Sequence, residues 1–128
     1  RALARQRGVS LRTEQADLFT WHWPTDAYDV VISIFAHFPP QERARMHRAM
    51  LTALRPGGLL ILEAFTPKQL DYKTGGPQSA ALLYTTAMLR QDFAGAEIIE
   101  IAELDTALDE GPYHAGRAAV IRLLLRRA

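Results

Sequence analysis

Residues 28–65 read YDVVISIFAHFPPQERARMHRAMLTALRPGGLLILEAF, and this stretch decides the fold. It begins with a β-branched run at residues 30–34 and ends with a second apolar run at residues 59–62. Strands of parallel sheets that are covered on both faces have this composition. Pro39 and Pro40 end the first run and preset the backbone for a helix start. We therefore expect strands at 28–35 and 59–62, joined by a helix in a right-handed βαβ unit.

The expected helix carries one apolar stripe on its surface. Its apolar residues recur at i, i+3, i+4, i+7 and i+8, and they are Met46, Ala49, Met50, Ala53 and Leu54. The arginines at positions 43, 45 and 48 largely avoid that stripe, as residues of a solvated face do. Pro56-Gly57-Gly58 then predicts a turn before the second strand.

The rest of the chain extends this pattern in both directions. Residues 66–79 form a long polar loop with the sequence Gly75-Gly76-Pro77, and Thr85 is placed to cap a short helix that runs to Asp92. Residues 96–108 and 118–125 are two β-rich runs joined by a short loop, which favours an antiparallel pair. Upstream, residues 1–7 read as the tail of a helix and residues 10–17 as a short strand. The chain is therefore predicted to be α/β, with a mostly parallel sheet.

Composition narrows the classes of function. The chain has 128 residues, 48% of them hydrophobic, which suits one domain with a substantial core. Its net charge of +1 does not indicate a nucleic-acid partner, and it has no cysteine for disulfide or thiolate chemistry. No apolar run is long enough for a membrane span, and no signal peptide is visible, so we expect a cytoplasmic protein. We expect no metal site, because His22 and His37 lack carboxylate or cysteine partners at ligand spacing.

Several segments resemble one enzyme family. The strand, the Pro-led helix and the Leu-x-Pro-Gly-Gly turn of residues 28–65 resemble class I S-adenosylmethionine-dependent methyltransferases. TGGP at 74–77, LRQDF at 89–93 and EGPYHAGRAAVIRL at 110–123 resemble the tellurite-resistance and thiopurine methyltransferase-like small-molecule subgroup. The resemblance implies a Rossmann-like sheet with helices on both faces and a C-terminal antiparallel strand pair. It also implies S-adenosylmethionine as cofactor and methyl transfer to a small-molecule acceptor.

The sequence departs from this family in one respect, since no G-x-G motif occurs in it. The family's strand order resembles 3-2-1-4-5-7-6, and its glycine-rich turn follows the first strand. We therefore expect residues 1–128 to be the C-terminal portion of a single methyltransferase domain, with two strands upstream of Arg1. The strand at 28–35 would then have a bare edge, so that the chain alone is unstable or is completed by another chain, for example as a homodimer through that edge. A monodisperse preparation with a cooperative melt would count against this expectation.

The resemblance places the cofactor at two segments. Asp17 would accept hydrogen bonds from the adenine amino group, with the backbone of Leu18 nearby. The alternative is that Asp17 starts a turn by bonding its own backbone. Ile34, Phe35 and Ala36 end the central strand, where ligands bind in open α/β sheets, and they would wall the adenine and the methionine part. The alternative is that they belong to the core.

His37 and His114 are the candidate catalytic residues. His37 directly follows the central strand and could act as a general base, although such a histidine more often bonds a loop carbonyl. His114 lies between the last two expected strands, in a hairpin whose basic residues approach the substrate in tellurite-type relatives.

Three further residues are candidates for contact with the acceptor. Tyr72, together with Gly75-Gly76, could form a lid over the substrate, or belong to an ordinary loop that needs positive φ angles. Tyr113 and Arg117 flank His114 in the hairpin, and a basic group there favours an anionic acceptor.

Three functional classes remain open from the residues. The first is a methyltransferase enzyme, and the second is a non-catalytic binding or regulatory module with a methyltransferase-like fold. The third is an oxidoreductase with a Rossmann-type sheet, which the Pro-Gly-Gly turn and the antiparallel terminal pair disfavour. The sequence before Arg1 would separate the first two, and calorimetric titration of the full-length protein with S-adenosylmethionine tests the same point.

Overall fold

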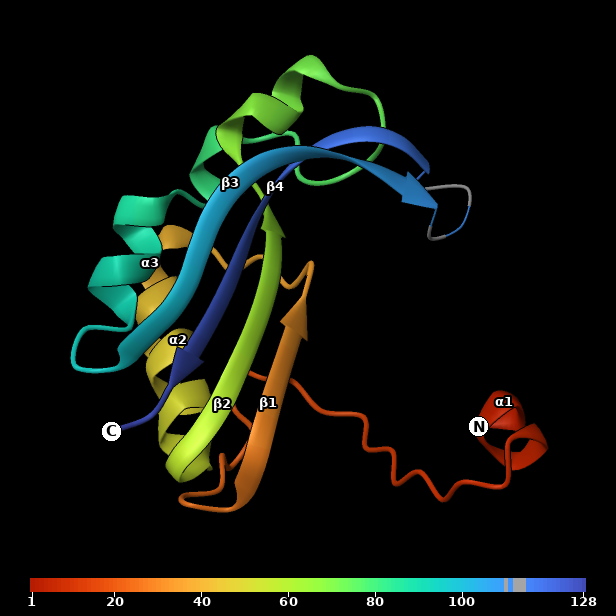
Figure 1. Cartoon of the computed structure of the whole chain (residues 1–128), viewed down its shortest axis with the longest axis vertical. Helices are drawn as coiled ribbons and strands as arrows, with labels where there is room; N and C mark the ends of the chain where they lie inside the picture. Colours follow the sequence, from red (N-terminus) through yellow and green to blue (C-terminus); the bar gives the residue numbers. More distant parts are fainter. Residues whose placement is uncertain (110, 112–114) are drawn as a thin grey trace.

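The computed structural model describes residues 1–109, 111 and 115–128. Two strands lie side by side at one end of its sheet, β1 (Tyr28–Ile34) and β2 (Leu54–Phe65). They pair in parallel, with Val30 opposite Leu59 and Ile34 opposite Glu63. The expected parallel pair is confirmed, and both strands end at the same edge of the sheet (Figure 1).

The Pro-Gly-Gly sequence forms a bulge inside β2 and not a turn before it. Tyr28 pairs with Leu54 and Val30 with Leu59, so residues 55–58 of β2 lie opposite the single residue Asp29. Gly58 is required at this point, because a Cβ atom there would lie 2.9 Å from the Arg55 carbonyl oxygen and 3.0 Å from that of Asp29. The bulge lets β2 begin five residues earlier than the apolar run alone predicts, at Leu54 instead of 59.

Two long strands complete the sheet, β3 (Glu97–Asp109) and β4 (Ala115–Arg126). β4 pairs antiparallel with both β2 and β3, which gives the strand order β1-β2-β4-β3. The expected antiparallel pair of β3 and β4 is confirmed. In the family's numbering, the strand order β1-β2-β4-β3 corresponds to strands 4-5-7-6, as the resemblance implies. β3 forms one edge of the sheet, and its solvent-exposed residues include Glu97, Glu100 and Glu103.

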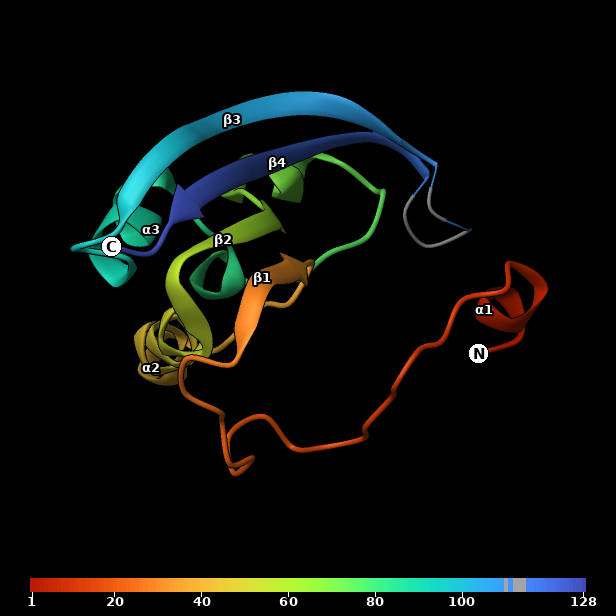
Figure 2. The same ribbon diagram turned by 60° about the horizontal axis from the view of Figure 1, so that its bottom comes forward.

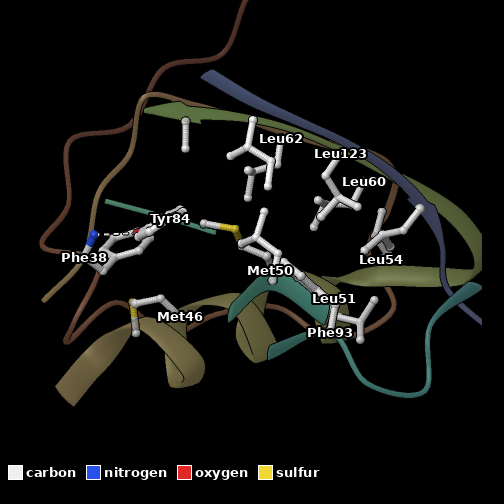
Figure 3. Packing of buried hydrophobic residues seen from close by; sticks show 14 residues of the cluster. Phe38, Met46, Met50, Leu51, Leu54, Leu60, Leu62, Tyr84, Phe93 and Leu123 are labelled. Carbon is white, nitrogen blue, oxygen red and sulfur yellow. Dashed lines mark hydrogen bonds between the residues drawn. The ribbon is translucent and has the colours of Figure 1, made fainter. Parts of the chain in front are cut away.

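The core lies between the sheet and helix α2 (Pro40–Ala53), which crosses from β1 to β2. Met46 and Met50 of the predicted stripe are at most 4% exposed, and they pack among the leucines of β2 and β4 (Figure 3). Leu54, predicted as the last residue of the stripe, is instead the first residue of β2. Burying one such side chain stabilises a fold by about 1.5–3 kcal/mol. The apolar stripe therefore fixes α2 on the sheet.

A second helix, α3 (Thr86–Asp92), packs beside α2 and follows two 3-10 helices, η1 (Pro67–Asp71) and η2 (Ala80–Leu82). The Thr85 hydroxyl accepts a hydrogen bond from the backbone nitrogen of Met88 at 3.2 Å, which confirms the predicted cap. α2 and α3 lie together on one side of the sheet (Figure 2).

Buried charges join the two helices. Asp92 Oδ2 lies 2.8 Å from Arg43 Nε and 2.7 Å from His47 Nδ1, and the side chains of Asp92 and His47 are 2% and 0% exposed. Burial acts to raise the pKa of Asp92, but hydrogen bonds from His47 and Arg43 outweigh burial and hold this pKa below its usual range. The ionised carboxylate therefore links α3 to α2.

The N-terminal segment stands apart from the sheet. Helix α1 (Ala2–Gln6), expected within residues 1–7, lies at the end of an extended arm and away from the strands (Figures 1 and 2). The strand predicted at residues 10–17 is wrong, since this segment has no strand structure. A strand needs a neighbour for its backbone hydrogen bonds, and no described strand pairs with the arm.

Helices were expected on both faces of the sheet. In the described residues, α2 and α3 both lie on the same face. On the other face, apolar side chains of β1 and β2 remain exposed, by 61% for Ile32, 54% for Ile34 and 42% for Ile61. No helix in the described residues combines the length and hydropathy that crossing a membrane requires.

Replacing Asp92 with Asn should lower the free energy of unfolding by about 3 kcal/mol, because the mostly buried Arg43 would lose its carboxylate partner. Urea unfolding at neutral pH measures this loss. Glu42→Gln is the matched control, since it breaks the exposed pair of Glu42 with Arg45 and should cost less than about 1 kcal/mol. Equal losses in the two variants would contradict the buried linkage.

The contribution of Asp92 to the free energy of unfolding should also depend on pH. A carboxyl group whose pKa is lowered by folding stabilises the fold above its unfolded pKa, and this stabilisation disappears as the pH falls through the folded pKa. The stability gap between wild type and Asp92→Asn should therefore close as the pH falls below about 4. Urea midpoints measured across the acid range test this, and a gap that stays constant would refute it.

Candidate functional site

Three aromatic rings form a layer at the carboxyl ends of β1 and β2. The rings of Phe35 and Phe65 are stacked, with centroids 4.3 Å apart and planes 10° apart. The His37 ring stacks on Phe65 at 5.7 Å with an angle of 15°. Because the two strands are parallel, their ends meet at the edge where open α/β sheets bind ligands. This layer is the centre of the candidate site.

The backbone turns sharply at the end of β1. Phe35 has φ of +53°, in the left-handed region, which costs a residue with a side chain roughly 1–2 kcal/mol. Its backbone nitrogen donates to the Glu63 carbonyl oxygen at 2.8 Å, so the turn stays attached to β2. Ile34 is exposed, while Phe35 and Ala36 are half-buried, and both also contact core residues. The three residues predicted to wall the cofactor thus lie together at this edge.

His37 is bonded through both ring nitrogens. Nδ1 lies 2.6 Å from the Leu82 carbonyl oxygen, and Nε2 accepts from the Phe65 backbone nitrogen at 3.1 Å. These partners require a neutral ring with its proton on Nδ1. Burial lowers the pKa of His37 against the opposing effect of the Leu82 hydrogen bond, and His47 lowers it further. General-base catalysis, as predicted from the sequence, would require one of these bonds to open.

Asp17 starts a turn beside this edge. Its Oδ1 accepts from the Phe19 backbone nitrogen at 2.9 Å, so one carboxylate oxygen is used in the turn. No partner for Oδ2 occurs among the described residues. The Phe19 ring packs edge-on against Phe38, with centroids 6.1 Å apart, and so brings the turn next to the residues that follow β1. The Leu18 carbonyl accepts from Trp23 Nε1 at 2.9 Å.

An open cavity of about 730 Å³ lies between the arm and residues 21–28. Leu18 lines it, whereas Ile34, Phe35 and Ala36 do not. The cavity is therefore separate from the aromatic layer. Of the residues predicted to bind the cofactor, Leu18 lines this cavity.

The loop at residues 66–79 is tied to the sheet. The buried side chain of Gln69 accepts from the Ala119 backbone nitrogen at 2.8 Å, and it donates to Thr74 Oγ1 at 2.7 Å and to the Gly75 carbonyl at 3.0 Å. Gly76 lies so close to Phe65 that a Cβ atom would come within 2.7 Å of the ring. The loop therefore packs against the aromatic layer, and its positive φ angles at Gly75 and Gly76 fit the alternative of an ordinary loop. A lid movement stays a prediction.

Tyr72 and Arg117 are brought together beside two residues that the sequence analysis missed. Lys68 Nζ lies 2.8 Å from Asp105 Oδ2. The hydrogen bond from Lys68 lowers the pKa of Asp105, and the nearby Tyr72 and the charge of Arg117 act in the same direction. A cavity of about 220 Å³ adjoins these groups, lined by Thr66, Lys68, Glu103, Leu104, Asp105 and Ala119. No spacing in the sequence signals this grouping, because the pairing of β3 with β4 creates it.

Tyr113 and His114, predicted as substrate and catalytic residues, lie outside the described residues. Within the described part of the chain, no group of three carboxylate or histidine residues is placed to hold a metal ion.

Comparison with known proteins identifies the fold. A family model described as a methyltransferase domain matches residues 1–58, and no curated protein matches the chain. TehB from Haemophilus influenzae superposes with a TM-score of 0.73 at 14% identity, over 99% of this chain and 44% of its own. A protein studied for the conversion of a disulfide bond into a thioacetal group during echinomycin biosynthesis superposes with a TM-score of 0.72 at 22% identity. The match covers 98% of this chain and 59% of that protein.

A third solved structure belongs to an S-adenosylmethionine-dependent methyltransferase from Mesorhizobium loti, with a TM-score of 0.64 at 22% identity, over 98% of this chain and 75% of its own. The chain therefore has the fold of class I S-adenosylmethionine-dependent methyltransferases, and it spans about 59% of the echinomycin-pathway protein and 44% of TehB. Likeness at these identities establishes the fold and not the reaction.

Replacing Gln69 with Leu should release the loop. The buried amide of Ala119 and the Gly75 carbonyl would lose their partners, which costs about 1–3 kcal/mol for each group left unsatisfied. We expect lower stability in urea and faster tryptic cleavage after the exposed Lys73. Gln78→Leu is the control, since Gln78 is exposed and makes one 3.5 Å contact. Cleavage at the wild-type rate in both variants would argue against the anchor.

Proposed function

We propose that this protein transfers a methyl group from S-adenosylmethionine to a small-molecule acceptor. The observation that carries the proposal is the ring layer of Phe35, Phe65 and His37 at the carboxyl ends of two parallel strands, in a chain with a class I methyltransferase fold. Ligands of open α/β sheets bind at this edge.

The residues at this edge fit the cofactor. Ile34, Phe35 and Ala36 offer the apolar surface that the adenine ring and the methionine chain need. Asp17 Oδ2, which has no partner among the described residues, can accept hydrogen bonds from the adenine amino group. When bound, S-adenosylmethionine supplies the methyl group on a sulfonium centre. The protein contributes position, orientation and the exclusion of water.

The acceptor would lie towards the loop and the β3–β4 hairpin. We propose that Tyr72 and Arg117 contact it, and their position around Asp105 with Lys68 supports this. Lys68 is neutralised by its pair with Asp105, so the preference for an acceptor with an anionic group rests on the charge of Arg117. His114 stays a candidate catalytic residue, as the resemblance of the hairpin implies. His37 is less suited to that role because both its nitrogens are bonded.

Three further statements belong to the same proposal. Residues 1–128 would form the C-terminal portion of a single methyltransferase domain, in keeping with their coverage of longer structures. The likeness to TehB supports the tellurite-type subgroup. A homodimer through the open edge of β1 and a cytoplasmic location stay predictions, and analytical ultracentrifugation tests the former.

Calorimetric titration of the full-length protein with S-adenosylmethionine tests the cofactor site. Asp17→Asn keeps the turn through its carbonyl oxygen but replaces the second acceptor with a donor, so we expect about tenfold weaker binding. Asp71→Asn is the matched control, because Asp71 is also exposed and lies in η1, and it should bind like wild type. If wild type gives neither heat nor a thermal shift, the proposed function is wrong.

Transfer of a labelled methyl group to small-molecule acceptors, oxyanions among them, separates the enzyme from a binding module. Turnover supports the enzyme. Binding without turnover on any acceptor class would favour the non-catalytic module with a methyltransferase-like fold.

A further inference from the structure

A single hydroxyl group spans the turn that follows β1. Tyr84 is fully buried, although it lies almost fifty residues further along the chain. Its hydroxyl accepts a hydrogen bond from the Phe38 backbone nitrogen at 2.7 Å and donates to the Ala36 carbonyl at 3.3 Å. One side chain therefore bonds a peptide group on each side of His37 and fixes their separation.

His37 connects the same turn to two other segments. Through Leu82 it is bonded to η2, and through the Phe65 backbone it is bonded to the end of β2. Its ring also lies 4.9 Å from the ring of Tyr84, between centroids. Residues 82–84 are thus bonded to the turn through the side chains of His37 and Tyr84. The loop at 66–79 leads directly into this segment.

The conformation of the turn needs such support. Phe35 is held at φ of +53°, and a strained residue of this kind persists only where its surroundings leave no alternative. Phe35 is stacked on Phe65 and bonded to Glu63, but both contacts lie on one side of the turn. The bonds of Tyr84, and the bond of His37 to Leu82, hold the turn from residues 82–84 as well.

We infer that Tyr84 and His37 are positioning residues, which hold residues 34–36 in the conformation that receives the cofactor. This inference rests on the proposed function. In this role His37 acts through the two hydrogen bonds of its neutral ring and transfers no proton. It also links the two halves of the site, because a change in the acceptor-side loop reaches the cofactor wall through Leu82 and Tyr84.

Tyr84→Phe tests the inference, since it removes the hydroxyl and keeps the ring in the core. We expect S-adenosylhomocysteine to bind the full-length variant about tenfold more weakly, measured by calorimetry well below the melting temperature. Two controls are matched to it. Tyr28→Phe removes a hydroxyl at the opposite end of β1, and Asp92→Asn destabilises the same core through a carboxylate that bonds neither Tyr84 nor His37. Both should bind within about twofold of wild type.

The outcomes separate the inference from the function it rests on. No binding by wild type refutes the proposed function before any variant is made. Wild-type affinity in Tyr84→Phe, or an equal loss in Asp92→Asn, refutes the positioning role alone.

Nitrogen NMR of the wild-type protein provides a second readout, and it decides the matter if Tyr84→Phe does not fold. The His37 ring should give the signals of a neutral ring protonated on Nδ1, and exchange of the Phe38 amide hydrogen should slow when S-adenosylhomocysteine binds. A ring protonated on Nε2, or Phe38 exchange that the ligand does not change, would overturn the inference.

Discussion

Parallel hydrogen bonding between β1 and β2 brings Phe35 and Phe65 to the same edge of the sheet, because strands that run the same way end on the same side. An antiparallel pair would have put their rings at opposite ends. The stacking of these rings, the bonds of His37 and the approach of Gly76 all depend on this direction. The candidate site is thus a consequence of how two apolar runs pair, and the later segments of the chain are assembled around their ends.

Much of the fold follows from local chemistry. The β-branched run at 30–34, the prolines before α2 and the cap at Thr85 each act within a few residues, so their patterns predict elements that the structure contains. The antiparallel pair at the end of the chain follows from two adjacent β-rich runs. The Pro-Gly-Gly segment shows where this reasoning stops, because its glycines allow a tight turn and a bulge equally. The pairing partner Asp29 decides between them.

The remaining features depend on contacts between distant residues. Residues 10–17 alternate like a strand, yet a strand also needs a neighbour, which no local pattern supplies. The carboxyl end of β1 was expected at the same sheet edge as that of β2 and lies there, whereas the two bonds of His37 depend on Leu82 and on the Phe65 backbone. In the same way, Lys68 meets Asp105 because of the loop path and the register of β3 on β4. Sequence patterns therefore suggest the place of the site better than the role of each side chain.

The acidic residues along β3 affect how the molecule behaves in concentrated solution. An uncovered strand of this length offers its backbone groups to any other strand, which is the first step towards fibres. A second copy approaching edge to edge would bring its own glutamates against Glu97, Glu100 and Glu103, and like charges repel at that distance. Electrostatic repulsion therefore disfavours growth of a continuous intermolecular sheet from this edge, so the long hairpin can remain in water without a covering element.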